Sequence, residues 1–548
     1  MTKRRRNLAL FLVIAGFALI AWLLLRPTEP EYQGRKLGHW LWEMEISPDS
    51  ASLSWKESIQ AIKTMGTNSL PTLLGMLRTE DAEWKRKFVS WSQETFGFDF
   101  EDFLPEVRRR RAQAGLRVLG PSAESAIPEL TRLVAGSDLQ ISSAALGALA
   151  EIGGPRTILP LISALTNASS QVSVPAAAML GNLRTPARPA IPALLQALTS
   201  PDAALRAGAA RALGEIAFSP ERCIPALTQA LNDTNSLVRF SAASALGQFG
   251  NLAESALPAI RALPLDGDEF ARRALPRAAI RVQCELRDGA VLRGPKSDKR
   301  IAFVFTGHEY AEGGETILNE LARHQGRGSF FLTGEFLTKP DHLPLLNRML
   351  NEAHYLGPHS DKHLLYCSWE DRRTLVTEQE FTDDLMVNVA KIPGRFGEER
   401  RFSRYFLPAF EHYNRDIYDW TRKLRWTLIN YTPGTRSNAD YTGEADKNFV
   451  SSQTIFDSIV KKEQEDPHGL NGFLLLLHIG SGPGRADKFH ARFGELLDYL
   501  AGKGYEFVGV DQLLSPFSRG FGPGFGPGFG PSSGGPADTP RPSFRRRN

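Results

Sequence analysis

The spacing of apolar residues through the middle of the chain is helical, and the pattern repeats. Amphipathic Ala/Leu-rich stretches such as residues 207–216 alternate with apolar ones such as residues 226–231. Prolines precede the apolar stretches at intervals of 32 or 33 residues, at Pro128, Pro160, Pro192, Pro225 and Pro258. Proline suits the first turn of a helix, where its missing N–H costs nothing. The repeat predicts stacked helix pairs, about six of them over residues 51–285.

This repeat resembles HEAT repeats, so we expect an α-helical solenoid. Between Pro71 and Pro128 the interval is longer by about 24 residues, which indicates an insertion into one repeat. The solenoid is expected to act as a spacer or scaffold. The alternative is a concave surface that binds a partner protein.

The hydrophobic pattern changes after residue 282. Residues 286–300 are charged and contain glycine, which predicts a linker. Short apolar runs then alternate with amphipathic stretches, which predicts a parallel sheet or barrel. The expected strands are residues 301–305, 329–332, 425–428, 472–477 and 505–510, with helices at residues 315–324 and 343–352.

The N-terminus carries a basic cluster, Lys3 to Arg6, followed by apolar residues 8–25. As a helix this run is about 27 Å long, close to the thickness of a membrane core. The charges predict that residues 1–26 form an uncleaved single-pass anchor in the cytoplasmic membrane, with the rest of the chain periplasmic or extracellular. A cleaved signal peptide is the alternative, and both readings export the protein. Residues 27–50 are expected to be a linker.

Composition narrows the function classes. The net charge of +4 is concentrated at the chain ends, so nucleic acid is not an expected partner. Three scattered cysteines are too few for a disulfide framework or a thiolate zinc site. Residues 517–548 repeat Gly-Phe-Gly-Pro and end in arginines, which predicts a disordered tail.

The strongest chemical signal is His359-Ser-Asp-Lys-His363. Two histidines four residues apart lie on one face of a helix and can bind one metal ion.

In this context residues 301–516 resemble polysaccharide deacetylases, which have a distorted parallel (β/α) barrel and use a divalent metal. The matching segments are His359–His363, the "FF.G" run at residues 330–334, the Leu-Pro of residues 407–408, and a late strand that ends in His478. The resemblance implies removal of acetyl groups from an N- or O-acetylated polysaccharide.

Two positions depart from the family pattern. Its first strand is followed by two aspartates, a base and a metal ligand, but here Thr306 and Gly307 stand opposite them. The arginine that orients the base is replaced by Leu407. The site is therefore either a variant or inactive.

For the variant site we expect His308, His359 and His363 to bind zinc, a three-histidine set that leaves a position for water. Glu309 is the expected base that accepts the water proton, and His478 the acid that protonates the leaving group.

Three further side chains complete the expected site. Glu411 is the alternative base. Trp426 and Phe410 are expected to contact the sugar, with packing inside the barrel as the alternative for Trp426. The predicted function is a membrane-anchored, metal-dependent deacetylase of an envelope or extracellular polysaccharide. The alternative is an inactive glycan-binding or scaffold protein that acts through its solenoid.

Overall fold

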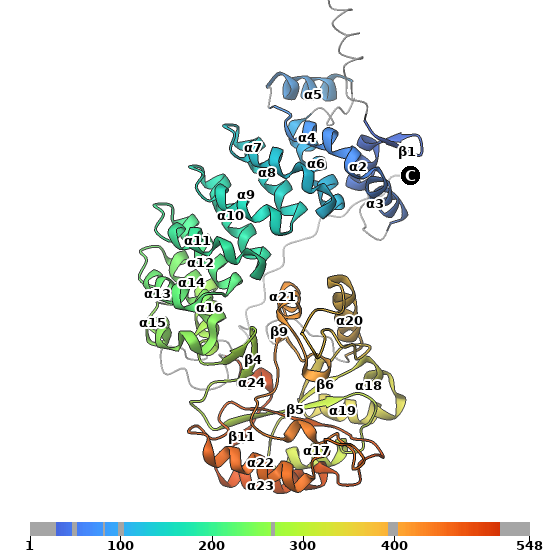
Figure 1. Cartoon of the computed structure of the whole chain (residues 1–548), viewed down its shortest axis with the longest axis vertical. Coiled ribbons are helices and arrows are strands. Elements are labelled where there is room, and N and C mark those ends of the chain that lie inside the picture. The colour runs from blue at the N-terminus through green and yellow to red at the C-terminus, as the bar shows by residue number, and fades with distance from the viewer. Residues whose placement is uncertain are drawn as a thin grey trace, which may run out of the picture.

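The chain folds into a helical half and a half built on a parallel sheet (Figure 1). A computed structural model describes residues 29–46, 52–80, 83–96, 104–264, 269–392 and 404–515. The predicted anchor (residues 1–26) and the predicted tail (residues 517–548) lie outside these ranges. Within them, no helix combines the length and apolarity that crossing a membrane requires.

The helical half is a curved stack of antiparallel helix pairs, preceded by a short hairpin of β1 (Glu31–Tyr32) and β2 (Arg35–Lys36). Its helices are α2 (Leu37–Ile46), α3 (Leu53–Met65), α4 (Leu70–Leu77), α5 (Glu83–Phe96), α6 (Pro105–Leu119), α7 (Ile127–Val134), α8 (Leu139–Ile152), α9 (Ile158–Ala164), α10 (Ser170–Leu183), α11 (Ile191–Ala197), α12 (Ala203–Ile216), α13 (Pro220–Ala230), α14 (Ser236–Leu246), α15 (Leu257–Arg261) and α16 (Glu269–Arg281). The predicted solenoid is confirmed.

Caps and prolines begin these helices where the sequence indicates. Pro128, Pro192 and Pro258 each occupy the first turn of a second helix. Pro225 differs, because α13 already begins at Pro220 and encloses it. The first helices are capped by side chains that accept backbone N–H groups, at Asp138, Ser169, Asp202 and Asn235.

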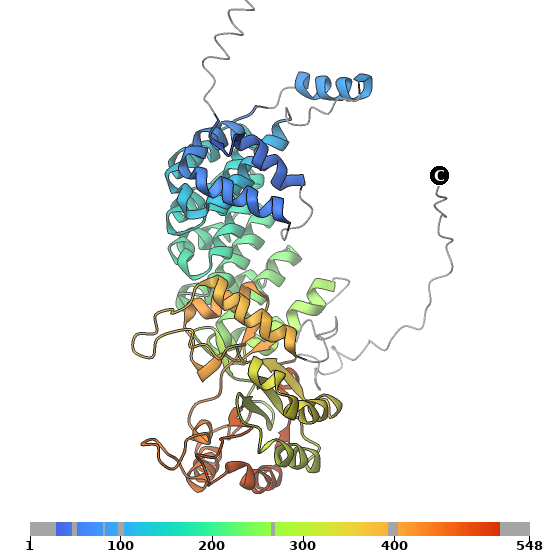
Figure 2. The same ribbon diagram turned by 90° about the vertical axis from the view of Figure 1, so that its right-hand side faces the viewer.

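One N-terminal segment agrees with the expected plan and another differs from it. The predicted insertion corresponds to α5, which both Figure 1 and Figure 2 show set apart from the stack. The expected linker at residues 27–50 contains α2, whose Leu37, Trp40 and Leu41 are buried in the solenoid core. Packed helix therefore begins earlier than the repeat pattern indicates.

Small residues allow neighbouring repeats to pack closely. A Cβ atom at Gly181 would lie 3.0 Å from the Cα of Ala212, and one at Gly214 would lie 2.6 Å from the Cα of Ala245. The corresponding distance from Gly247 to Ala278 is 3.4 Å. These contacts recur with the repeat period, so each repeat carries the small residues that set its distance from the next helix.

The other half is built around a sheet of parallel strands. Its strands are β3 (Glu285–Arg287), β4 (Ala290–Arg293), β5 (Arg300–Gly307), β6 (Ser329–Leu332), β7 (Tyr355–Pro358), β8 (Tyr405–Phe406), β9 (Thr427–Leu428), β10 (Leu474–His478) and β11 (Glu506–Phe507). The order is β10-β5-β6-β7, and β11 also pairs with β5. Strands β8 and β9 form a separate parallel pair. The strands of the described residues therefore do not show the closed barrel that the sequence predicts.

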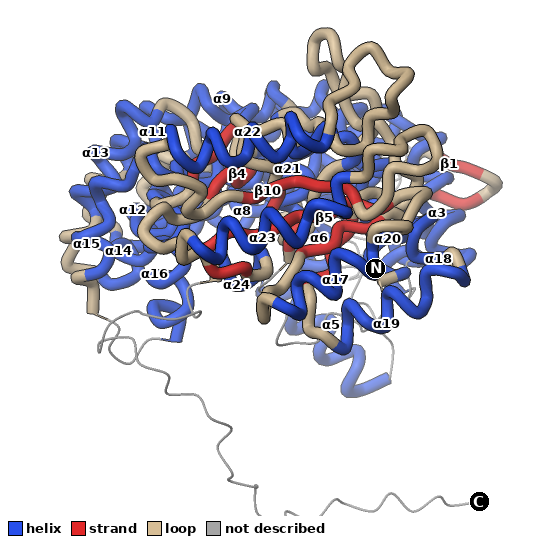
Figure 3. The backbone as a smooth tube through the Cα atoms, turned by 90° about the horizontal axis from the view of Figure 1, so that it is seen from below, coloured by secondary structure: helices blue, strands red, loops and turns tan. Residues whose placement is uncertain are grey.

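Helices cover the sheet on the side away from the solenoid, where α17, α19, α22 and α23 lie together in Figure 3. The helices of this half are α17 (Gly314–Arg323), α18 (Gly334–Thr338), α19 (Leu343–Asn351), α20 (Glu378–Lys391), α21 (Arg415–Lys423), α22 (Ser452–Glu465), α23 (Phe493–Gly502) and α24 (Val510–Leu513). Along β5, Phe303 and Phe305 pack on the helical side, whereas Ala302 and Val304 face the opposite core. This alternation follows from the pleat of a strand.

The segment predicted to be a linker, residues 286–300, is instead part of the second half. Strands β3 and β4 form an antiparallel hairpin within it, and β4 is entirely buried. The Arg293 guanidinium forms an ion pair with Asp466 at 3.0 Å. One of the charged residues that suggested a linker is thus used in a buried ion pair.

Candidate active site

Parallel pairing gathers the expected site residues at one edge of the sheet. His308 follows β5, Thr333 follows β6 and His359 follows β7, while His478 is the last residue of β10. The register pairs His478 with Thr306 and Leu332 with both Gly307 and Pro358. Since the carboxyl ends of parallel strands meet at the same edge, these side chains lie close together.

The loop from His359 to His363 is held by α20, and it is not a helix. The Asp384 carboxylate accepts hydrogen bonds from the backbone N–H groups of Asp361 and Lys362. Ser360 and His363 have φ angles of 72° and 52°, in the left-handed region. The expectation of two histidines on one helical turn is therefore wrong. The loop nevertheless places the two rings 5.5 Å apart.

The orientation of His359 is set on both sides. Its backbone N–H donates to the Asn388 side chain at 2.8 Å, and its Nδ1–H donates to the Leu407 carbonyl at 2.9 Å. Since Nδ1 carries the proton, Nε2 has a free lone pair, 3.8 Å from a Glu411 carboxylate oxygen. Burial and the nearby His363 hold the pKa of His359 well below its usual range.

His363 is enclosed between two other rings. The His308 ring stacks on it with centroids 4.4 Å apart, and the Phe410 ring lies 4.3 Å away. Burial, with the neighbouring His308, lowers the pKa of His363 to about 4. His308 itself is anchored through Nδ1, which lies 3.1 Å from the Thr333 hydroxyl.

The two candidate bases are in different environments. Glu309 is exposed, and its carboxylate is hydrogen-bonded to the adjacent Tyr310 hydroxyl, whose pKa it raises. The Glu411 carboxylate instead faces His359, and burial raises its pKa to about 7. Phe410 and Glu411 also share left-handed φ angles of 59° and 52°. Such backbone strain costs about 1–3 kcal/mol per residue and concentrates at functional sites.

A second carboxylate orients His478. The Nδ1 atom of His478 lies 2.6 Å from one Asp440 oxygen, and the backbone N–H donates to the other at 2.9 Å. Burial acts to lower the pKa of His478, but the Asp440 charge outweighs it and the pKa is raised. The Tyr441 ring lies 4.9 Å from the His478 ring. His478 is therefore an oriented imidazole with a tendency to carry a proton.

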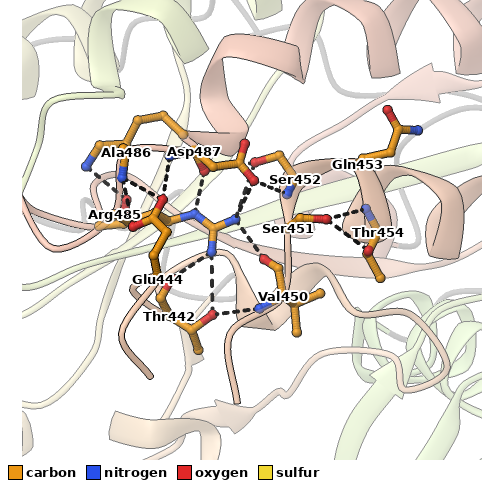
Figure 4. Close-up of polar contacts among 12 residues, drawn as sticks. Thr442, Glu444, Val450, Ser451, Ser452, Gln453, Thr454, Arg485, Ala486 and Asp487 are labelled. Atoms are coloured by element: carbon orange, nitrogen blue, oxygen red, sulfur yellow. Dashed lines mark hydrogen bonds and ion pairs between the residues drawn. The ribbon is translucent and has the colours of Figure 1, made fainter. Parts of the chain in front are cut away.

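A buried arginine fixes the loop that supplies Asp440 (Figure 4). Arg485 is fully buried, and its guanidinium donates to the carbonyls of Thr442, Val450 and Asp487. Glu444 accepts the backbone N–H groups of residues 486 and 487. The loop after β10 is thus joined to the loop that contains Asp440 and Tyr441.

Packing accounts for the glycine at the second of the two positions where the family has aspartates. A Cβ atom at Gly307 would lie 2.8 Å from the Phe336 ring and 2.9 Å from the Ile479 side chain, so no carboxylate fits there. Leu407, in place of the arginine, is fully buried in the core. The departures from the family pattern belong to the packing of this chain.

Two of the expected ligands, His359 and His363, are in the neutral form that a zinc ion requires. Zinc requires unprotonated ring nitrogens, and His359 and His363 both have lowered pKa values. The Thr306 hydroxyl is buried at this edge without a hydrogen-bond partner in the described chain. In the described ranges, however, no three His, Cys, Asp or Glu side chains are grouped so that they could hold one metal ion, so the expected three-histidine set of His308, His359 and His363 is not formed. His308 presents its ring face to His363.

The sequence pattern indicates the histidines at this edge of the sheet, but it does not indicate the side chains that hold them in place by hydrogen bonds. Asp384, Asn388 and Asp440 carried no motif, although a histidine that ends a buried strand needs an acceptor for its second ring nitrogen. Trp426, expected to contact substrate, is instead buried in a core cluster with Phe406. Trp426 also lines a cavity between α16 and β9, and none of the site histidines lines that cavity.

Comparisons with known proteins agree with the repeats. Residues 191–280 match the model of HEAT repeats, and residues 143–167 match that of the PBS lyase HEAT-like repeat. No curated protein matches the chain.

Among solved structures the chain is similar to carbohydrate esterases. A CE4 family pseudoenzyme from Bacillus anthracis is 15% identical over 42% of this chain and 70% of its own, with a TM-score of 0.32. A family 4 carbohydrate esterase from Bacillus subtilis is 21% identical over 41% and 84%, with a TM-score of 0.33. A peptidoglycan N-acetylglucosamine deacetylase is 18% identical over 40% and 91%, with a TM-score of 0.32. At these low scores, function has to be argued from the site.

Proposed function

We propose that the sheet-containing half is a hydrolase that removes acetyl groups from a polysaccharide, with Glu411 as general base and His478 as general acid. The observation that carries the proposal is the arrangement of a buried carboxylate at His359 and a second one, Asp440, that orients His478. Paired acid and base groups in distinct environments are what acyl transfer to water requires.

Each residue has a distinct part in this reaction. Glu411 accepts a proton from the attacking water, and it replaces Glu309 in that role because Glu309 is turned to Tyr310. His478 then donates a proton to the departing sugar nitrogen or oxygen. Asp440 keeps the His478 ring in one orientation and stabilises its charged form, as a buried carboxylate does for the histidine of a hydrolase triad.

A divalent metal ion, with zinc as the best match to the ligand type, is part of this proposal. His359 and His363 would hold it, and a bound metal would polarise the acetyl carbonyl. Neutral imidazoles at His359 and His363 support this assignment.

Exposed aromatic rings beside the histidines support a sugar substrate. Phe410 lies against His363 and is 41% exposed, while Trp369 lies 6.1 Å from Phe410 and is 59% exposed. Tyr441 is also exposed beside His478. Flat apolar rings with polar groups nearby suit the faces of sugar rings, and we assign these three residues, rather than Trp426, to substrate contact.

The location of the protein is a separate part of the proposal. We infer that residues 8–25 anchor the chain in the cytoplasmic membrane with the remainder outside, where envelope polysaccharide is present. Protease added to intact spheroplasts should then degrade the solenoid. Complete protection of the solenoid would exclude this orientation.

Acetate release from acetylated glycans is the direct test of the activity. The full chain should release acetate, and Glu411→Gln should lower the rate while Glu309→Gln leaves it unchanged. A second candidate, an inactive glycan-binding protein, is favoured by the lack of room for a carboxylate at Gly307. Glycan binding with no acetate release, whether or not zinc is supplied, would establish that candidate instead.

A further inference from the structure

A cavity lies where the solenoid meets the sheet-containing half. It has a volume of about 720 Å³. One wall is α16, the last solenoid helix, and the other includes β9 and the end of α21. None of the residues of the candidate active site lines it.

The cavity is lined by arginines. Arg273, Arg277 and Arg281 come from α16, and Arg422 and Arg425 come from the other half. No aspartate or glutamate is among the described residues that line it.

The carboxylates around the cavity leave part of this charge uncompensated. Arg273 pairs with Glu269, and Arg422 with Glu215, which Arg184 also contacts. The buried Asp419 carboxylate adds a further negative charge beside Arg422. Asp511 acts on Tyr405 in the wall. Arg281 and Arg425 form no ion pair with any described residue.

Buried donors in the wall also lack acceptors. The Arg281 Nε–H is buried and donates to no described residue. The Tyr418 hydroxyl is buried beside Arg422 and likewise donates its proton to no acceptor in the described chain. Burial alone would raise the pKa of Tyr418, yet the pKa is lowered because Arg422, Arg281 and Arg415 favour the phenolate. An unsatisfied buried donor is costly, so such groups are normally paired.

We propose that this cavity binds the phosphate group of a phosphorylated small molecule. The guanidinium is always charged and its fork of donors matches the oxygens of phosphate, which makes arginine the usual side chain for this anion. The Arg281 and Tyr418 donors would receive the acceptors they lack, and Arg425 would add a charge at the exposed side. The volume exceeds that of inorganic phosphate, so a group attached to the phosphate also fits.

The proposal is independent of the acetyl hydrolysis, because its residues and its readout are separate. Binding to the full chain is measured by calorimetry with inorganic phosphate, pyrophosphate and glucose 1-phosphate. Vesicles containing phosphatidylglycerol form a further arm, which separates a lipid headgroup from a soluble phosphate. We expect saturable binding, strongest for a soluble ligand larger than inorganic phosphate.

The variants test the arginines one at a time. Arg281→Lys keeps the charge but removes the fork, and it should weaken affinity by about tenfold or more, as the loss of a charge-assisted hydrogen bond does. Arg425→Ala should also weaken binding, and because Arg425 is exposed its replacement should leave the fold intact. Arg272→Ala is the matched control, since Arg272 is exposed on the same helix but does not line the cavity.

Defined outcomes would overturn the proposal. These are no binding of any phosphate compound, equal binding by the Arg425→Ala and Arg272→Ala variants, or an equal signal from chloride at matched ionic strength. Binding to the vesicles alone would retain the phosphate chemistry and assign its source to a lipid headgroup.

Discussion

Glu309 and Glu411 differ in what surrounds each carboxylate. Glu309 directly follows His308 but is exposed and bonded to Tyr310. Glu411 is distant in sequence from His359 but lies 3.8 Å from its Nε2.

Glu411→Gln should therefore lower acetate release by about 10²–10⁴-fold, the usual range for loss of a general base. Glu309→Gln, which changes the same functional group at the surface, should retain the wild-type rate. Initial rates on an acetylated glycan check this, with circular dichroism to confirm that both variants fold. A reversed order of the two rates would restore Glu309 as the base.

The Asp440–His478 pair makes a different prediction. Asp440→Asn leaves the volume of the side chain almost unchanged but removes the charge that raises the pKa of His478. The acidic form of His478 then loses its proton at lower pH, so the alkaline limb of the pH–rate profile should move to lower pH and kcat should fall. An unchanged alkaline limb would exclude His478 as the acid.

At the scale of helices and strands, Gly214 and Gly208 give a matched pair on α12. A Cβ at Gly214 would lie 2.6 Å from Ala245 Cα, whereas one at Gly208 would lie 3.5 Å from Ala177 Cβ, an ordinary contact. Gly214→Ala should destabilise the solenoid by about 1–3 kcal/mol, as overpacking does. Gly208→Ala should stabilise it by up to about 1 kcal/mol through helix propensity. Urea unfolding measures both, and effects of the same sign would refute the close packing.

The sequence predicts well the elements whose apolar residues or prolines recur at a regular spacing. Prolines such as Pro128 and Pro192 located the second helices, and the apolar runs located β5, β6 and β10, because burial on a regular element leaves a regular pattern. The support for His478 could not be predicted in this way. Asp440 lies in a long irregular loop whose position depends on buried Arg485 and on no local pattern.

Glu411 and the loop at His359 show the same limit. Glu411 itself, and Ser360 and His363 in the loop, have left-handed backbone conformations that no sequence rule favours at those positions. Their conformation is imposed by tertiary contacts, here from α20 and from the Leu407 carbonyl.

For the whole molecule, the hairpin β3–β4 decides where the second half begins. Leu292 accepts a hydrogen bond from Thr432, and Gly289 packs against the Tyr418 ring. A fragment of residues 284–515 should fold, whereas one of residues 301–515, which lacks the hairpin, should be strongly destabilised. Thermal unfolding of the two fragments tests this, and equal melting temperatures would return residues 286–300 to the status of a linker.

The Arg293–Asp466 ion pair joins the β3–β4 hairpin to the end of α22 and makes the stability of this half depend on pH. Burial acts to raise the pKa of Asp466, but hydrogen bonds from Arg293 and Lys462 outweigh it and lower the pKa. A lowered pKa contributes stability above the unfolded value of about 4, and this stability is lost as pH falls below it.

Asp466→Asn should therefore cost about 3–5 kcal/mol at neutral pH, since it leaves Arg293 buried without its partner. The difference from wild type should shrink as pH falls below about 4, because the Asp466 carboxylate then takes up a proton in the unfolded chain while its lowered pKa keeps it ionised in the folded protein. Denaturant unfolding of both proteins across pH measures the difference. A difference independent of pH would mean that the charge of Asp466 contributes nothing.

The contacts of Gly181, Gly214 and Gly247 with alanines of the next repeat restrict how this protein can change length during evolution. A duplication or deletion of a complete repeat leaves every glycine opposite an alanine. A change of any other length puts a larger side chain at the position of Gly181 or Gly214, where a Cβ atom would lie 3.0 Å or 2.6 Å from the next helix. Descendants of this gene should therefore differ in solenoid length by whole repeats, and each step would change the separation between the N-terminal helices and the sheet-containing half by a fixed increment.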